Sequence, residues 1–223
     1  MTVATVSKTD VQLKKDVEAE LQYESRVNST EIGVAVKDGV VTLAGWVDSY
    51  AKRSYAAEAT HRVRGVKALA NEIEVRLPAS AERTDVDIAK AAAQALEWDS
   101  TVTTDDLDVT VTKGWITLKG TVNWAFERDN AERVVQHLTG VKGVTNLIAI
   151  KPQVMPGELK RKIEDALVRS AHTDASHIFV VASGSHVTLS GTVRSYAEKQ
   201  DAGRAAWAAP GVTAVDNRIT VAN

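Results

Sequence analysis

The sequence contains one pattern three times in tandem, and this repetition restricts the fold more than any other feature. A shift of 75 residues superposes Gly45 on Gly120, and a further shift of 71 carries Gly120 to Gly191. The same shifts align other glycines, asparagines and leucines: Gly65, Gly140 and Gly211; Asn71, Asn146 and Asn217; Leu21, Leu96 and Leu167. We therefore expect three copies of one small domain, at residues 7–77, 82–151 and 154–223, joined by short proline-containing linkers.

The spacing of apolar residues predicts the same order of elements in every copy. In the first copy, Leu13, Val17 and Leu21 follow a helical spacing after the capping pair Thr9-Asp10. Alternating apolar residues over 32–36 and 41–47, separated by a short glycine turn, predict two strands. A second helix with small inward residues and a closing strand follow. The predicted fold class is α+β, with three tandem αββαβ modules.

A glycine lies inside the second predicted strand of each copy. These residues are Gly45, Gly120 and Gly191. Glycine weakens a strand, so its recurrence indicates a bulge or the close approach of another backbone, here expected to be a helix.

Composition and motifs argue against catalysis and against several kinds of partner. The formal net charge is −2, and there is no cysteine. Nucleotide-binding glycine loops and nucleophile elbows are missing from the sequence. His172, Asp174 and His177 offer too few ligands for a metal site, and the GxxG sequence at 140–143 is interpreted as a turn rather than an RNA clamp. We expect a non-enzymatic protein without cofactor, metal or nucleic-acid partner.

Two further absences bear on location. No run approaches the roughly 20 apolar residues of a membrane span, and the first residues lack the apolar stretch of a signal peptide. A cytoplasmic protein without a transmembrane segment is the expectation.

The repeated motifs resemble those of the BON domain family of bacterial proteins. The resemblance rests on the strand-turn-strand segments GVVTLAGWV, GWITLKGTV and SHVTLSGTV, and on the closing segments GVKALANEIEV, GVKGVTNLIAI and GVTAVDNRITV. It implies a three-stranded mixed sheet with two helices on one face, and no catalytic role. It also implies work in osmotic or envelope stress, through binding of phospholipid surfaces or assistance to protein folding. Because known relatives are exported, the family offers a periplasmic location as the alternative.

With both helices on one face of each sheet, the other face is left open. Strand alternation assigns apolar residues to it in every copy: Ala35, Val40, Ala44 and Trp46; Trp115, Leu147 and Ala149; Phe179 and Val181. We expect these faces to pack on one another or on a second copy of the chain. The alternative is that they bind a partner or a lipid surface.

Four tryptophans occupy positions at which the other copies carry no tryptophan, unlike the residues of the shared scaffold. They are Trp46, Trp115, Trp124 and Trp207. Such residues are expected to make contacts between repeats or with a partner. The candidate binding residues are these four together with Phe126, Phe179 and the basic run Lys160, Arg161 and Lys162.

The preferred hypothesis is therefore a BON-repeat binding protein of stress adaptation that contacts proteins or phospholipid surfaces. Two alternatives stay open. One is a structural module that forms homo-oligomers through the open sheet faces. The other is a cytoplasmic sensor of ions or small ligands.

Overall fold

The computed structural model describes residues 8–151, 159–169 and 177–222, and it has the predicted α+β architecture of three αββαβ modules. The first module consists of α1 (Asp10–Tyr23), β1 (Ile32–Lys37), β2 (Val40–Val47), α2 (Tyr50–Arg62) and β3 (Ala68–Val75). The second consists of α3 (Asp85–Trp98), β4 (Leu107–Thr112), β5 (Trp115–Val122), α4 (Ala125–Val135) and β6 (Gly143–Ile150). The third consists of α5 (Leu159–Arg169), β7 (Ile178–Ser183), β8 (His186–Val193), α6 (Tyr196–Trp207) and β9 (Ala214–Val221).

Each module has a mixed sheet whose middle strand is the second one. In the first module β1 and β2 pair antiparallel, whereas β3 returns after α2 and pairs parallel with β2. The hairpin turn places Asp38 (φ 54°) and Gly39 (φ 81°) in the left-handed region. The Asp10 carboxylate, at the start of α1, accepts hydrogen bonds from both of their N–H groups, at 2.7 and 3.0 Å. One carboxylate therefore fixes the helix against the turn.

Every module buries its own hydrophobic core between the sheet and the two helices. In the first module the helical residues Leu13, Val17 and Leu21 pack against Val41 and Leu43 of β2, and all five are at most 2% exposed. The other two modules repeat this core. Small residues of the second helices, such as Ala56 and Ala59, are fully buried and let these helices lie close to the sheet. Of the capping pair Thr9-Asp10, Thr9 is the N-cap of α1, and the equivalent Thr84 is the N-cap of α3.

The glycine inside the second strand marks a close approach, made by the segment just before the first strand, which in the first module ends a short 3-10 helix (Ser29–Glu31), rather than by an α-helix. Gly45 has φ 130°, and a Cβ atom built on it would lie 2.0 Å from the carbonyl oxygen of Glu31, just before β1. Pairing of β2 runs through this glycine without an extra residue, so there is no bulge. The equivalent Gly120 and Gly191 show the same approach.

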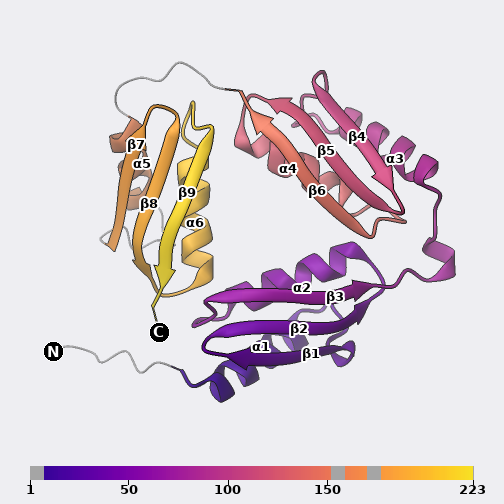
Figure 1. The fold of residues 1–223 in the computed structure, drawn as a ribbon, viewed down its shortest axis with the longest axis horizontal. Helices are drawn as coiled ribbons and strands as arrows, with labels where there is room; N and C mark the ends of the chain where they lie inside the picture. The colour runs from indigo at the N-terminus through magenta and orange to yellow at the C-terminus, as the bar shows by residue number, and fades with distance from the viewer. Residues whose placement is uncertain (1–7, 152–158, 170–176, 223) are drawn as a thin grey trace.

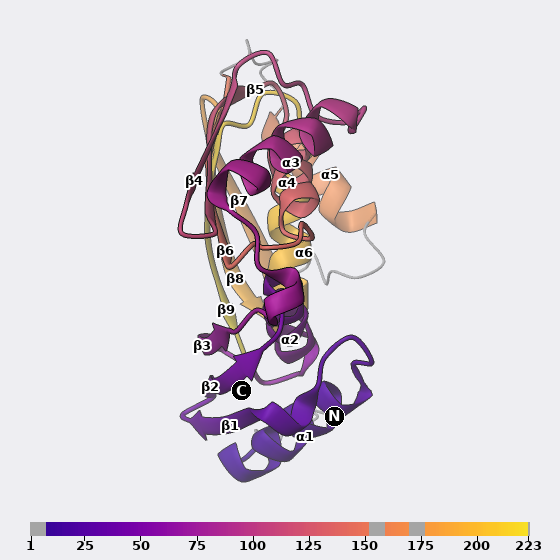
Figure 2. The ribbon, with the colours of Figure 1, turned by 90° about the vertical axis from the view of Figure 1, so that its right-hand side faces the viewer.

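The three modules are arranged around a common centre, with the second helices and the third strands on the inner side (Figure 1). Helices α2 and α6 contact each other there. The view in Figure 2 places the sheets on one side of this flat arrangement and the helices on the other. The expectation that the open sheet faces pack on one another is therefore wrong, because all three sheets face the same way.

Candidate functional sites

The first candidate site is the side of the molecule formed by the three sheets, here called the sheet side (Figures 1 and 2). Outward strand positions carry large apolar residues that remain exposed, from 37% at Trp46 to 65% at Phe179. The others are Val40, Trp115, Leu147 and Val181. Strand alternation had assigned all six to this face. Each module thus presents apolar side chains in the same direction.

Two of these tryptophans are held in place by contacts within their own modules. The Trp115 ring covers Gly143, where a Cβ atom would lie 2.5 Å from the indole, and its Nε1 donates to Thr145 Oγ1 at 2.8 Å. The Arg76 guanidinium lies 5.9 Å from the centre of the Trp46 ring. Neither tryptophan takes part in an inter-module ring or hydrogen-bond contact among the described residues. Both rings are therefore pre-positioned on the sheet.

Three ion pairs on the sheet side join charges of opposite sign. Arg76 pairs with Glu74 at 2.6 Å, Arg218 with Asp216 at 2.7 Å, and Lys151 with Asp106 at 2.5 Å. Lys151 also lowers the pKa of the Asp106 carboxyl, chiefly through the hydrogen bond that it donates to this carboxyl. These three pairs therefore add no net charge to the sheet side.

The second candidate site is the set of joints between modules, built largely by the second helices. Tyr196, the first residue of α6, stacks on His61 near the end of α2, with ring centroids 3.9 Å apart and planes inclined by 15°. Between the first and second modules, the Tyr55 hydroxyl and His137 Nε2 are 2.7 Å apart. His137 Nδ1 lies 2.7 Å from the Arg133 carbonyl oxygen, which can only accept, so Nδ1 is the donor of that hydrogen bond.

His61 is shielded from water in its joint. Burial lowers the pKa of its imidazole, and no charged neighbour contributes to this shift. Its Nδ1 atom is buried and has no hydrogen-bond partner among the described residues. Burial also raises the pKa of Tyr50, which packs on the core of the second module.

Aromatic residues of the second and third modules enclose a groove of about 410 Å³. Trp124 and Phe126 contribute from the start of α4, and Trp207 from the end of α6. Trp207 packs on the cores of both modules, and the Arg128 guanidinium lies 4.5 Å from the centre of its ring. Trp207 therefore makes a contact between repeats, which is one of the two roles that the sequence left open for it.

Trp124 is the N-cap residue of α4, a position at which the other two modules carry serine. The first and third modules use Ser49 and Ser195 as side-chain N-caps of their second helices. In the second module the N-cap residue Trp124 makes no side-chain cap, and the buried Glu127 accepts from the N–H groups of Asn123 and Trp124, just before the helix, at 2.9 and 2.8 Å. The backbone donors just before α4 are thus satisfied by Glu127.

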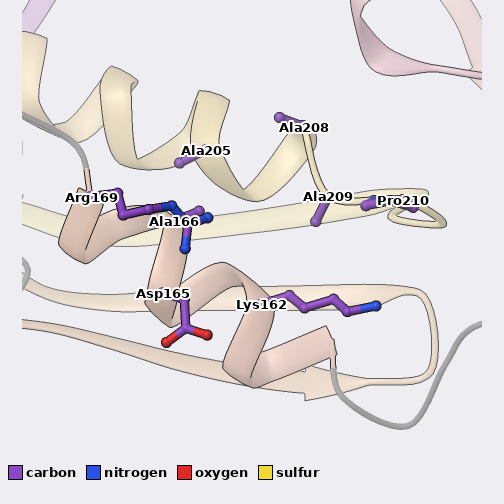
Figure 3. A pocket seen from close by; sticks show the side chains of 8 residues that line it. All are labelled: Lys162, Asp165, Ala166, Arg169, Ala205, Ala208, Ala209 and Pro210. Atoms are coloured by element: carbon purple, nitrogen blue, oxygen red, sulfur yellow. The ribbon is translucent and has the colours of Figure 1, made fainter.

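The basic run lies apart from both sites, on the exposed surface of α5. Lys160 pairs with Glu164 at 3.6 Å. Lys162 lines a separate hollow between α5 and α6 (Figure 3), where the Asp165 carboxylate points away from the alanines of α6. The structure thus divides the nine candidate residues among three places: Trp46, Trp115 and Phe179 on the sheet side; Trp124, Phe126 and Trp207 at the groove; and Lys160, Arg161 and Lys162 on α5.

Sequence reasoning missed the tyrosines and histidines of the joints. Tyr50 and Tyr196 recur at equivalent positions, with Ala125 in the second copy, whereas His61 aligns with Gln136 and Trp207; only for His61 was failure to recur an available signal. Within the described ranges, no group of three or more acidic, histidine or cysteine residues could hold a metal ion. His172 and Asp174 lie outside the described residues. The described helices include none that is long and apolar enough to cross a bilayer.

Comparison with known proteins agrees with the repeated architecture. The BON domain model matches residues 9–76, 84–152 and 157–223. Osmotically-inducible protein Y of Escherichia coli (strain K12) is 30% identical over 148 residues, covering 64% of this chain and 73% of that protein.

Among solved structures, the chain is similar to CdsD, a structural protein of the type III secretion system of Chlamydia trachomatis. The TM-score is 0.26 at 14% identity, with 93% of this chain and 91% of that one covered. The C-terminal domain of CdsD matches with a TM-score of 0.27 at 13% identity, covering 97% of this chain and all of that one. On the threefold match of the family model, this chain belongs to the BON domain family.

Proposed function

We propose that this protein serves adaptation to osmotic stress as a non-enzymatic binding protein that docks its sheet side on a phospholipid surface. Membership of the BON family and similarity to an osmotically inducible protein support the physiological setting. The observation that carries the docking surface is the common direction of the three sheets, each with exposed apolar or aromatic residues (Figure 2).

Three weakly binding faces on one molecule give a strong combined attachment. Once the first module touches a surface, the others are held close to it, so the later contacts are intramolecular. Tryptophan rings suit the boundary between lipid and water, because they are apolar with one polar N–H group. Trp46 and Trp115 are already held in position, which lowers the entropy lost on binding.

The paired charges of the sheet side define which lipid surface is expected. Without an excess of Lys and Arg, attraction to anionic lipid contributes little, and apolar contact dominates. Binding should therefore differ little between zwitterionic phosphatidylcholine vesicles and vesicles containing phosphatidylglycerol, and it should persist when salt is raised.

Vesicle co-sedimentation of the full chain tests this proposal. The double variant Phe179→Ser and Val181→Ser should bind at least about tenfold more weakly, because two exposed apolar anchors are removed. Trp98→Ser is the matched control, since Trp98 is 76% exposed but lies on α3, on the opposite side. Failure of the unaltered protein to bind either vesicle at low salt would overturn the proposal.

A second copy of the chain is the competing occupant of this side. Light scattering distinguishes self-association from lipid binding. A dimer formed through the sheet side would dissociate in the Phe179→Ser and Val181→Ser variant. A stable dimer of that kind, together with absent vesicle binding, would assign the side to self-assembly instead.

A further inference from the structure

The groove between α4 and α6 lies outside the sheet side and is a separate candidate binding site. Its walls come from two modules: Trp124 and Phe126 of the second, Trp207 and Ala208 of the third. Its volume of about 410 Å³ falls within the roughly 300–1,000 Å³ of small-molecule sites. Phe126 is 55% exposed and Trp124 37% exposed, so apolar surface stays open to solvent here.

The charged groups at the groove are already paired within the chain. Asp129 pairs with Arg128 at 2.9 Å, and Arg204 pairs with Asp201. A charged ligand would therefore have to compete with these ion pairs for its partner, which weakens its binding. An uncharged ligand has no such cost.

The two indoles supply uncharged hydrogen-bond donors at the groove. The Nε1–H groups of Trp124 and Trp207 make no hydrogen bond to any residue that the structure describes, and indole is a donor only. A carbonyl or ether oxygen on the ligand could accept from one of them. Apolar walls with a few donors are typical of sites that select a neutral ligand by shape and by one or two hydrogen bonds.

The groove is also continuous with an interface that already exists. Trp207 forms one of its walls and at the same time packs on the cores of the second and third modules. One face of the Trp207 ring is covered by Arg128. A ligand in the groove would contact both modules, and its binding would stabilise their joint.

We propose that this groove binds a small uncharged molecule with an aromatic or branched apolar body and a hydrogen-bond-accepting oxygen. This site is independent of the lipid docking proposed above, and its test contains no vesicles. The probe is Prodan, an uncharged naphthalene ketone whose fluorescence reports an apolar environment. Anilinonaphthalene sulfonate is the matched probe with a negative charge.

Prodan should bind the full chain, whereas the sulfonate should bind at least about tenfold more weakly. Phe126→Ser should weaken Prodan binding about tenfold, because it removes an apolar wall. Phe179→Ser is the control, since it removes an aromatic of similar exposure, 65%, on the sheet side. Ala208→Leu provides a second variant that fills the groove rather than emptying it, and it should also reduce binding.

The outcomes separate cleanly. Loss of Prodan binding in both groove variants but not in Phe179→Ser supports the site. Equal binding by all variants, absence of Prodan binding by the unaltered chain, or equally tight binding of the sulfonate would overturn it. Thermal unfolding of each variant without probe shows that the fold is retained.

Discussion

Tyr196 at the start of α6 stacks on His61 near the end of α2, and this contact joins the first and third modules, which no linker connects. Linkers connect the first module to the second and the second to the third. The Tyr196–His61 stack thus closes the arrangement into a ring (Figure 1). At the position of His61, the other modules carry Gln136 and Trp207, so each joint uses different chemistry on the same scaffold.

Removing the Tyr196–His61 stack should lower the free energy of unfolding of the chain by a measurable amount. Stacked aromatic pairs contribute about 0.5–1.5 kcal/mol beyond the area they bury. A double-mutant cycle with Tyr196→Ala and His61→Gln should therefore give a coupling energy of about 1 kcal/mol in denaturant unfolding. Alanine is the residue that the second module carries at the position of Tyr196. The same cycle with Tyr23→Ala in place of Tyr196→Ala should give no coupling, because Tyr23 is 85% exposed on α1.

The same joint should respond to pH. Because burial holds the pKa of His61 below its usual value of 6.5, the folded chain binds this proton less readily than the unfolded chain. The contribution of His61 to stability is therefore complete above about pH 6.5 and is lost as the pH falls through and below that value. His61→Gln should remove this part of the pH dependence. If the free energy of unfolding fell by the same amount in both proteins between pH 7.5 and pH 5, the prediction would be contradicted.

The interior of each module was predictable from sequence, because it depends on local patterns. Strand alternation identified the buried face and the exposed one, as Leu43 and Trp46 illustrate. Turn chemistry identified the hairpin at Gly39. These patterns recur in all three copies, so the prediction of each element rests on three segments of sequence.

The joints were not predictable in the same way, because module placement depends on contacts between residues far apart in sequence. His61 and Tyr196 are ordinary surface residues when each helix is considered alone. Trp207 could be assigned to a joint because a large aromatic replaced polar residues in the other copies. The absence of tryptophan at the equivalent positions of the other copies did not distinguish Trp207 from Trp115, which contacts its own sheet.

Glu24 should govern part of the acid unfolding of the first module. Its carboxylate accepts hydrogen bonds from Arg26 at 2.7 and 2.9 Å and from Arg62 at 3.0 Å, which lowers its pKa from 4.5 to about 2. Its contribution to stability is thus present above pH 4.5 and lost as the pH falls from 4.5 towards 2. Glu24→Gln should destabilise the chain at pH 7 and reduce the loss of stability in that range. Glu18→Gln is the control, because Glu18 makes only an exposed ion pair with Lys14.

Gly45→Ala should destabilise the first module more than any surface substitution. The new Cβ atom would lie 2.0 Å from the Glu31 carbonyl oxygen, and φ 130° is a conformation that alanine rarely adopts. Backbone strain of this kind costs about 1–3 kcal/mol, and the clash adds to it, so a loss of about 3 kcal/mol or more is expected in denaturant unfolding. Gly33→Ala is the matched control on the neighbouring strand, since its Cβ atom would meet only ordinary contact at 3.7 Å. If both substitutions cost the same, the strand glycine is not retained for this close approach.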